Sequence, residues 1–363
     1  MKLFLTGGFL GSGKTTAIQQ AVYYLQQLNK KAGVITNDQG EKQVDTRFIK
    51  SGNIPVGEVA NSCFCCNYPA LENGILSLEK NNNVEIVFAE SVGSCTDLAA
   101  TIINPLLQFN PGRYDIVLSV FADVRMLVLF LQNDKRLFFD DVTYIYQKQL
   151  EEADIIIVNK IDLITNEQLE AVTPLIASAY PGKKILYQNS LSEDSIKIWV
   201  DTLLTGFNNK LLRPALTVDY DLYGAGEAEL AWLDEEVTIV TKDETAADAC
   251  YTLMKIINDK IMAGGYPIGH LKFLMDSGLQ QCKISFTSIY AQPKQNEFHI
   301  KAQRITLLIN ARVQVPPGVL QQLIDDATAE TALTAGCTIT QNSVACFKPG
   351  YPRPTHRVTG IAV

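Results

Sequence analysis

Residues 8–15 read Gly-Phe-Leu-Gly-Ser-Gly-Lys-Thr, and this stretch decides the fold of the chain. It follows the apolar run 2–6 and precedes residues 17–28, whose apolar side chains recur at helical spacing. Glycines in a loop between a strand and a helix let backbone N–H groups surround a phosphate at the helix N-terminus. The sequence therefore predicts a phosphate-binding loop, against the alternative of a glycine-rich turn with an incidental lysine.

The polar residues of this loop have predicted roles toward a bound nucleotide. Lys14 is expected to reach the β and γ phosphates and is a candidate catalytic residue. Thr15 is expected to ligate Mg²⁺. The loop residues predicted to bind the nucleotide are Gly8, Gly11, Ser12, Gly13, Lys14, Thr15 and Thr16.

A second motif indicates which base is bound. Residues 159–162 read Asn-Lys-Ile-Asp and follow the apolar run 155–158. The carboxylate of Asp162 can accept hydrogen bonds from N1–H and the 2-amino group of guanine, whereas adenine offers a ring acceptor and no amine there. We therefore predict that Asn159, Lys160 and Asp162 bind guanine and that the cofactor is GTP or GDP; the alternative is a plain turn after a strand.

An acidic residue closes another apolar run. Residues 90–93 read Glu-Ser-Val-Gly and follow residues 85–89. A carboxylate at such a strand end can hold Mg²⁺ through water, and the N–H of Gly93 can meet the γ-phosphate. Glu90 is thus a second candidate catalytic residue, against the alternative of an exposed glutamate in a turn.

Short apolar runs alternate with amphipathic segments up to about residue 205, which is typical of an α/β fold: a parallel P-loop NTPase sheet with helices on both faces. Thr165 and Gln168 form a predicted capping box that begins one of these helices. The predicted strands are 2–6, 32–36, 84–90, 115–121, 154–158 and 184–187.

A linker at 206–214 separates this region from a different pattern, so we predict domains at 1–208 and 214–363. Two helices on one antiparallel sheet would make the second a smaller α+β domain, loosely ferredoxin-like. The predicted strands there are 234–241, 268–275, 280–288, 297–310 and 336–346, and the predicted helices are 244–262 and 317–330.

Composition excludes several classes of protein. The formal net charge of the 363 residues is −8, which argues against a nucleic-acid-binding body. No apolar run approaches the roughly 18 residues of a membrane span, and Met1 leads directly into the run 2–6 without a signal-peptide profile. We expect a soluble, cytoplasmic protein without nucleic-acid or membrane partners.

Three of the eight cysteines, Cys63, Cys65 and Cys66, lie within four positions. In a reducing compartment such clustering indicates metal or redox chemistry rather than a disulfide framework. Thiolates favour Zn²⁺ or Cu(I) and also hold Co²⁺ or Ni²⁺. Three thiolates leave a coordination position open, which suits metal transfer; a redox switch and buried structural cysteines are the alternatives.

Taken in order, the motifs GFLGSGKTT, TNDQGE, CFCC, ESVG and NKID resemble the CobW-type metal-chaperone GTPases. These are relatives of the GTPases that help to insert nickel into urease and hydrogenase, and the resemblance covers residues 1 to about 205. It implies a GTPase that delivers a transition metal, Zn²⁺ first and Co²⁺ or Ni²⁺ next, to a client metalloprotein or cofactor enzyme. It makes Cys63, Cys65 and Cys66 the metal ligands, with Glu41 as a neighbouring ligand.

The segment 36–38, Thr-Asn-Asp, is closer to the nickel-insertion relatives, in which an aspartate after the second strand lies near the γ-phosphate. Thr36 and Ser62 stand where other members have an acidic residue and a glycine. The resemblance makes Asp38 the candidate for orienting the attacking water, against an exposed loop aspartate. No arginine finger accompanies it, so we expect slow intrinsic turnover, with a partner, a bound metal or a nucleotide- or metal-dependent homodimer supplying the missing group.

Two other functions stay open on the sequence alone. One is a GTP-gated activator of a cofactor enzyme, for example a corrinoid enzyme, without tight metal binding. The other is a thiol redox sensor on a nucleotide-binding scaffold. Cys346 and His356 flank a rigid, proline-containing loop that is either a second metal site or a partner-docking tail.

Overall fold

The computed structural model describes residues 1–40, 44–132, 140–205, 211–287 and 300–360. It divides into two compact units, each of which includes a segment distant in sequence from the rest. The first unit contains Met1–Gln39, Gly52–Gly226 and Tyr351–Val363, and the second contains Gly40–Ser51 and Glu227–Gly350. The predicted domains at 1–208 and 214–363 stay a prediction. Among the described residues, no helix combines the length and apolarity that a membrane span requires.

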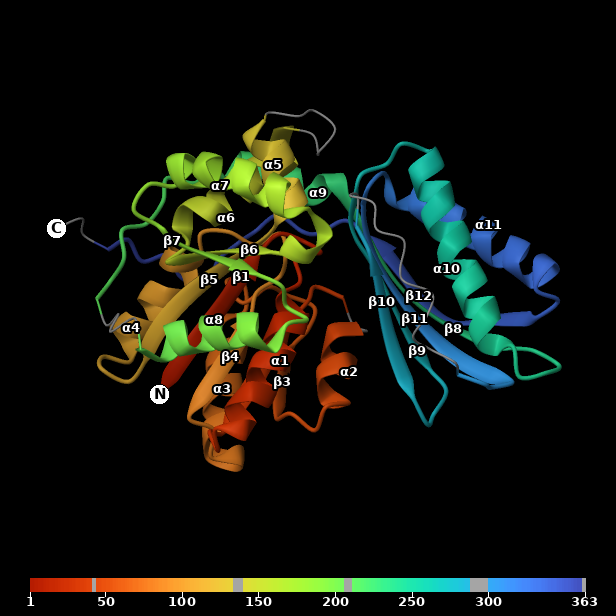
Figure 1. Ribbon diagram of the computed structural model, residues 1–363, viewed down its shortest axis with the longest axis horizontal. Helices are drawn as coiled ribbons and strands as arrows, with labels where there is room; N and C mark the ends of the chain where they lie inside the picture. Colours follow the sequence, from red (N-terminus) through yellow and green to blue (C-terminus); the bar gives the residue numbers. More distant parts are fainter. Residues whose placement is uncertain (41–43, 133–139, 206–210, 288–299, 361–363) are drawn as a thin grey trace. The chain divides into compact units, whose positions relative to one another are not determined.

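The first unit is built on a parallel sheet of seven strands in the order β3-β2-β4-β1-β5-β6-β7. Helices α1 and α8 lie on one face of this sheet, and α3 and α4 lie on the other (Figure 1). This confirms the predicted α/β class. The strands are β1 (Lys2–Gly8), β2 (Ala32–Asn37), β3 (Val56–Val59), β4 (Ile86–Glu90), β5 (Asp115–Asp123), β6 (Ile155–Asn159) and β7 (Lys184–Gln188).

The helices of this unit connect the strands in alternation. A π-helical turn, η1, continues directly into α4, and a 3-10 turn, η2, follows β6. The helical elements are α1 (Lys14–Gln27), α3 (Tyr68–Asn82), η1 (Ala99–Ile103), α4 (Asn104–Phe109), α5 (Val124–Leu131), α6 (Asp140–Glu152), η2 (Ile161–Leu163), α7 (Asn166–Ala179), α8 (Glu193–Thr205) and α9 (Tyr220–Glu229).

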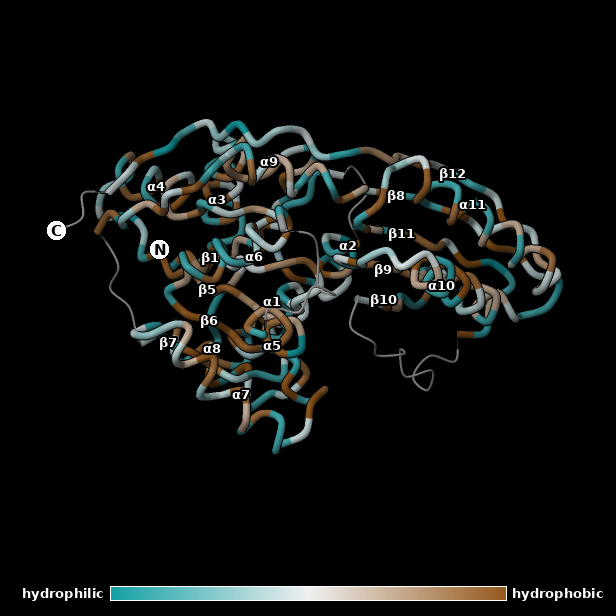
Figure 2. Tube along the Cα trace, turned by 90° about the horizontal axis from the view of Figure 1, so that it is seen from above, coloured by the Kyte–Doolittle hydropathy of each residue, from teal (hydrophilic) through white to brown (hydrophobic). Residues whose placement is uncertain are grey.

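The central strands are hydrophobic along their whole length because helices cover both of their faces. Figure 2 shows this colouring along β5 and β6. In the register of the sheet, Thr6 of β1 pairs with Glu90 of β4 and with Ser119 of β5. The carboxyl ends of parallel strands meet at one edge, so the loops after β1, β4 and β6 gather there, where ligands bind in open α/β sheets.

The second unit is an antiparallel sheet of five strands in the order β10-β9-β11-β8-β12. Helices α10 (Ala246–Ala263) and α11 (Pro317–Thr334) both cover one face of it (Figure 1). The order β12-β8-β11-β9 is that of a ferredoxin-like unit, with β10 added at the edge, which confirms the predicted α+β architecture. The strands are β8 (Leu230–Val240), β9 (Ile268–Asp276), β10 (Gln281–Phe286), β11 (Arg304–Gln314) and β12 (Thr338–Phe347).

The opposite face of this sheet carries helix α2 (Val44–Lys50), which comes from between β2 and β3 in the sequence. Val44 packs against Leu274 and Leu308, whereas their sequence neighbours Phe273 and Leu307 belong to the core under the other helices. Neighbouring strand residues point to opposite faces of a sheet, so α2 lies opposite α10 and α11.

Candidate functional site

The phosphate loop bends at two glycines that no other residue can replace without strain. Gly8 has φ +120°, and a Cβ there would collide with the backbone of Phe121. Gly13 has φ +94°, and a Cβ there would collide with the side-chain amide of Asn159. Helix α1 begins immediately afterwards, at Lys14. The loop therefore has the strand-to-helix turn that exposes backbone N–H groups to a phosphate.

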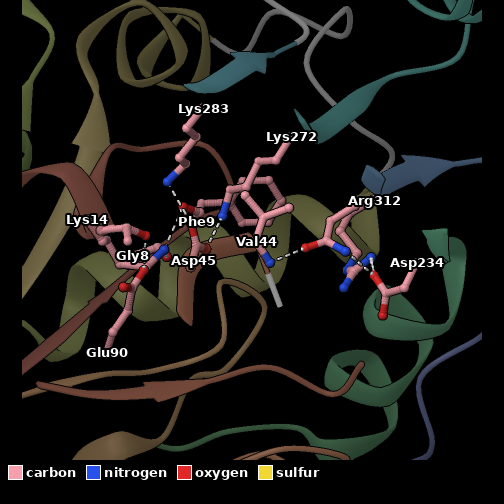
Figure 3. Close-up of polar contacts among 12 residues, drawn as sticks. Gly8, Phe9, Lys14, Val44, Asp45, Glu90, Asp234, Lys272, Lys283 and Arg312 are labelled. Carbon is pink, nitrogen blue, oxygen red and sulfur yellow. Dashed lines mark hydrogen bonds and ion pairs between the residues drawn. The ribbon is translucent and has the colours of Figure 1, made fainter. Parts of the chain in front are cut away.

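The predicted phosphate lysine, Lys14, and Glu90, the carboxylate of the predicted magnesium pair, lie together beside this loop (Figure 3). The ammonium of Lys14 donates to the carbonyl oxygens of Gly8 at 2.6 Å and Phe9 at 3.1 Å. The hydroxyl of Thr15 donates to Glu90 Oε1 at 2.9 Å. Glu90 is buried at the end of β4, so the alternative of an exposed turn glutamate is wrong. The structure thus brings together the hydroxyl and carboxylate expected to hold Mg²⁺, and their roles stay predictions.

The loop after β4 lies directly against the phosphate loop. A Cβ on Gly93 would lie 2.6 Å from a methyl carbon of Leu10, so only glycine fits there. The side-chain amide of Gln149, on α6, donates to the carbonyl oxygens of Gly93 and Cys95, both at 2.9 Å. Gln149 thus fixes the loop that carries the predicted γ-phosphate contact. Sequence reasoning missed it because it lies inside an ordinary amphipathic helix.

The predicted guanine motif follows β6 at the same edge of the sheet. Asn159 is fully buried and donates from Nδ2 to the carbonyl oxygen of Ser12 at 2.8 Å, which ties this strand end to the phosphate loop. Lys160 pairs with Asp123 at 3.1 Å. The side chain of Asp162 is exposed in η2, where a base can reach it. The three residues remain the predicted guanine-binding set, with Asn159 also positioning the loop.

Asn37, at the end of β2, connects that strand to the loop of residues 60–66, which we call the cysteine loop. Its side-chain amide donates to the carbonyl oxygens of Val59 at 2.9 Å and Ser62 at 2.6 Å. Its Oδ1 accepts the backbone N–H of Phe64 at 2.9 Å. Both the NH2 group and the oxygen of this amide therefore form hydrogen bonds with β3 or the cysteine loop. The sequence marked this residue only as part of a family motif.

Asp38, the predicted water-orienting residue, follows Asn37 directly. Its side chain is half-buried, and its N–H donates to the carbonyl oxygen of Val59 at 3.3 Å. A movement of Asp38 must therefore act on the same strand end that supports the cysteine loop. The other acidic residue predicted near the metal, Glu41, lies outside the described residues.

The three cysteines of the cysteine loop form a group that fits a soft metal ion. Cys63 and Cys65 are buried, Cys66 is half-buried, and the three sulfurs lie within 4.8 Å of one another. The sulfur–sulfur distances are 2.9 Å for Cys63–Cys65 and 3.8 Å for Cys65–Cys66. A tetrahedral Zn²⁺ with Zn–S bonds of about 2.3 Å places its sulfurs about 3.8 Å apart. One pair therefore already has the spacing of zinc ligands, and the other must open by roughly 1 Å.

The three thiols of this cluster differ in pKa. Hydrogen bonds from the thiols of Cys65, Cys66 and Cys95 stabilise the Cys63 thiolate and lower the pKa of Cys63. The same arrangement raises the pKa of Cys65, and the Cys63 hydrogen bond raises the pKa of Cys66 to about 11. Once one of the three thiols has ionised, its negative charge therefore disfavours the ionisation of the other two. A bound divalent cation reverses this preference by stabilising several thiolates at once.

Residues 351–360 of the C-terminal segment pack on the first unit beside the cysteine loop. The N–H of Thr355 donates to the carbonyl oxygen of Cys65 at 2.7 Å, and its hydroxyl donates to that of Cys66 at 3.0 Å. The ring of His356 contacts the rings of Tyr68 and Phe109, each at 5.0 Å between centroids. The segment therefore packs on other residues of the first unit. Cys346, at the other end of the predicted loop, belongs to the second unit, where its sulfur lies 3.2 Å from the carbonyl oxygen of Pro317.

A buried glutamate supports the loop that follows Cys95. Glu152, at the end of α6, accepts the hydroxyl of Thr96 and the N–H of Ala99, both at 3.2 Å. Burial, with the nearby charge of Asp97, raises the pKa of Glu152 to about 8. The folded chain therefore holds this carboxyl neutral, whereas an unfolded chain ionises it near its ordinary pKa of 4.5. Its stabilising contribution is full below pH 4.5 and is lost as the pH rises through 8.

We expect Glu152→Gln to make the first unit more stable than wild type by roughly 2–4 kcal/mol at pH 9, and to flatten its pH dependence. The amide oxygen can still accept the N–H of Ala99, the amide nitrogen can donate to the hydroxyl oxygen of Thr96, and the group carries no charge. Urea unfolding at pH 5 and pH 9, followed by Trp199 fluorescence in a Trp232→Phe background, measures the difference. Glu170→Gln, at an exposed position of α7 in the same unit, is the control. Parallel pH curves for Glu152→Gln and wild type would contradict the raised pKa.

A glycine-bent phosphate loop, a Thr–Glu pair beside it and a third motif at the same sheet edge define a P-loop nucleotide-binding protein. The chain belongs to the CobW/HypB/UreG family, whose nucleotide-binding domain matches residues 2–187.

Relatives of known name cover only part of this chain. The zinc chaperone YeiR of Escherichia coli is 28% identical over 172 residues, 46% of this chain and 49% of YeiR. The zinc chaperone YjiA of the same organism is 30% identical over 162 residues, 44% of this chain and 49% of YjiA. The crystal structure of HypB from Helicobacter pylori in complex with nickel has a TM-score of 0.40 at 16% identity, covering 56% of this chain and 85% of HypB. The matched part thus spans about half the length of the two curated relatives.

Proposed function

We propose that this protein is a GTP-hydrolysing metal chaperone that binds a transition metal through Cys63, Cys65 and Cys66 and delivers it to a client. The observation that carries the proposal is the amide of Asn37, which joins the end of β2 to the cysteine loop through two hydrogen bonds and to the end of β3 through a third. Asp38, the candidate for sensing the γ-phosphate, is the next residue. A nucleotide-dependent movement of this strand end therefore acts on the metal ligands within a few residues.

Hydrolysis is supported by the residues around the phosphate loop. Lys14 would neutralise the β and γ phosphates, and the Thr15 hydroxyl with the Glu90 carboxylate would hold Mg²⁺, which supplies charge neutralisation during phosphoryl transfer. Gly93 would offer its N–H to the γ-phosphate, and Asp162 would select guanine. Asp38 would orient the water. Without an arginine finger in these motifs, the turnover would be slow until a client, a metal or a second copy of the chain completes the site.

The chemistry of the sulfurs makes Zn²⁺ the first metal to test, with Co²⁺ and Ni²⁺ as alternatives. YeiR and YjiA are named zinc chaperones, which supports the same choice. The client would be a metalloprotein or a cofactor enzyme that receives the ion.

The proposal predicts that metal affinity depends on the nucleotide. The affinity for Zn²⁺ should differ by about 5- to 150-fold between the GTP-bound and GDP-bound protein, a coupling of about 1–3 kcal/mol, and by linkage Zn²⁺ must change the nucleotide affinity by the same factor. Competition with a zinc indicator at fixed pH, with a non-hydrolysable GTP analogue, with GDP and without nucleotide, measures it. We expect Asn37→Ala to bind zinc but to lose most of the difference, because the strand end no longer holds the cysteine loop.

The controls test zinc binding by the cysteines separately from its dependence on the nucleotide. Cys65→Ser with Cys66→Ser should lose zinc binding and keep GTP binding, whereas an unchanged zinc affinity would show that these cysteines are not the site. Equal zinc affinity in every nucleotide state would exclude the coupled chaperone. A wild type that binds GTP and a client enzyme but no zinc would favour a GTP-gated activator instead.

A second function has one observation in its favour. The sulfurs of Cys63 and Cys65 are 2.9 Å apart, so little movement is needed for oxidation to a disulfide. A thiol redox sensor would lose two titratable thiols on mild oxidation and change its GTP turnover as it did so. Thiol titration with turnover measured in parallel distinguishes it from the chaperone, whose zinc-bound thiols resist the same oxidant.

A further inference from the structure

Residues 351–360, the C-terminal segment, lie on the first unit, although the chain up to Gly350 belongs to the second unit. These ten residues form no helix and no named strand, so individual hydrogen bonds hold them in place. Their N–H groups donate to backbone carbonyl oxygens in three parts of the first unit: Thr355 to Cys65 at 2.7 Å, Val358 to Ala100 at 2.8 Å, and Gly360 to Arg213 at 3.2 Å. A segment attached in this way can detach at a smaller cost in free energy than a core strand or helix.

Thr355 contacts the backbone of two predicted metal ligands. Its N–H donates to the carbonyl oxygen of Cys65 at 2.7 Å, and its hydroxyl donates to that of Cys66 at 3.0 Å. The carbonyl oxygen of the third ligand, Cys63, accepts the N–H groups of Cys66 at 3.1 Å and Asn67 at 2.9 Å, within the turn itself. One residue, 289 positions after Cys66 in the sequence, therefore adds two hydrogen bonds to those that the turn makes internally.

Arg357 attaches the C-terminal segment to the body of the first unit two residues after Thr355. Its Nε donates to Asp97 Oδ2 at 2.8 Å, and its guanidinium also donates to the carbonyl oxygen of Leu216 at 2.9 Å. Asp97 is 1% exposed, and the same Oδ2 accepts the hydroxyl of Tyr220 at 2.8 Å. A hydrogen bond to a buried carboxylate is costly to lose, because the carboxylate cannot replace its partner with water. We therefore expect Arg357 to keep Thr355 in place.

We propose that the C-terminal segment is a latch on the metal site, in which Thr355 positions the cysteine loop and Arg357 holds Thr355 in place. This inference rests on the proposed metal-binding function and deepens it, because it states how the ion is retained and released. The docked segment holds the turn whose three sulfurs lie within 4.8 Å of one another. When the segment undocks, the carbonyl oxygens of Cys65 and Cys66 lose these donors, so the ligands gain conformational freedom and the ion dissociates faster.

The latch must also respond to the metal. If docking of the C-terminal segment strengthens zinc binding, then zinc strengthens docking by the same factor. The amides of residues 355–358 should therefore exchange with solvent about 10- to 100-fold more slowly when zinc is bound, the range in which outer-shell contacts change metal affinity. Hydrogen exchange read by mass spectrometry on the full chain, with and without equimolar zinc, measures this. A segment that only completes the fold would exchange equally fast in both samples.

The rate of zinc release into excess chelator tests the two residues of the latch. Arg357→Gln should release zinc at least about 10-fold faster than wild type. Thr355→Val, which loses the hydroxyl donor but keeps the N–H, should release it at a rate between the two. X-ray absorption at the zinc edge should count the same number of sulfurs in all three proteins, because no ligand is removed. Arg353→Gln removes the same charge at an exposed position of the segment and should keep the wild-type rate.

Release at the wild-type rate from Arg357→Gln, together with equal exchange at residues 355–358 with and without zinc, would overturn the latch and leave the three-cysteine metal site standing. A wild type that holds no zinc at equimolar metal would overturn the metal site and the latch with it. If Arg357→Gln does not fold, the release rate of Thr355→Val and the exchange of wild type decide the question.

Discussion

Replacing Lys14 by alanine is expected to lower kcat for GTP hydrolysis by about 100- to 1000-fold, the cost of removing one preorganised positive group that faces developing charge. The ammonium of Lys14 is held at the mouth of the phosphate loop by two backbone carbonyl oxygens, so its charge is positioned before a phosphate arrives. Single-turnover and steady-state phosphate release, with GTP at saturation, measure the loss.

Lys197→Ala is the matched control, because Lys197 is an exposed lysine on α8 in the same unit. It should hydrolyse GTP at the wild-type rate. A Lys14→Ala protein that keeps wild-type turnover would show that residues 8–15 do not form the hydrolytic site. The same assay with ATP tests the base: equal turnover of ATP and GTP by wild type would contradict the guanine assignment of Asp162.

The first unit was largely predictable because its signals are local. The apolar runs become β1, β2, β4, β5, β6 and β7, and the glycines of residues 8–15 fall where positive φ values occur. The Thr165–Gln168 capping box begins α7 as predicted. The motifs converge because strands run parallel, which places each following loop at one edge. Each of these features depends on neighbours in sequence, and therefore can be read from it.

What escaped prediction depends on contacts between distant segments. Strand β3 has only four residues, Val-Gly-Glu-Val, and most of them are partly exposed, so its sequence contains no apolar run. Asn37 and Gln149 act through hydrogen bonds to backbone groups of distant segments that no spacing rule connects. In the second unit, β11 begins at Arg304 rather than at the predicted 297, and residues 297–299 lie outside the described residues. The tail at 351–360 carries no signal for its place beside the cysteine loop.

Helix α2 is the clearest case, since nothing in the sequence assigns it to the C-terminal sheet. Its Asp45 carboxylate accepts Lys272 of β9 at 2.5 Å and Lys283 of β10 at 2.7 Å (Figure 3). The N–H of Val44 donates to Asn310 Oδ1 at 2.9 Å. Burial alone would raise the pKa of Asp45, but the two lysines hold it well below its usual range. The carboxylate therefore stabilises the helix above the ordinary carboxyl pKa, and this contribution is lost as the pH falls through the lowered value.

We expect Asp45→Asn to release α2 from the sheet, because removing one partner of a largely buried ion pair costs about 3–5 kcal/mol. The amides of residues 44–50 should exchange with solvent at least about 100-fold faster, while those of β11 keep their protection. Arg47→Gln is the control: Arg47 is 40% exposed in its pair with Glu236, so its loss should cost no more than about 1 kcal/mol. Hydrogen exchange read by mass spectrometry on peptides covering 44–50 measures both variants.

The functional consequence follows from where α2 sits in the chain. Asp38, the candidate γ-phosphate sensor, lies six residues before Val44, and the chain enters the second unit at Gly40. We expect fixation of Asp38 by GTP to affect α2, because only a few residues of sequence separate the two, and Asp45 anchors α2 on the C-terminal sheet. In wild type, exchange at 44–50 should therefore slow with a GTP analogue relative to GDP. In Asp45→Asn it should be fast in both states; a nucleotide effect that survives the substitution would show that α2 responds to the nucleotide without this anchor.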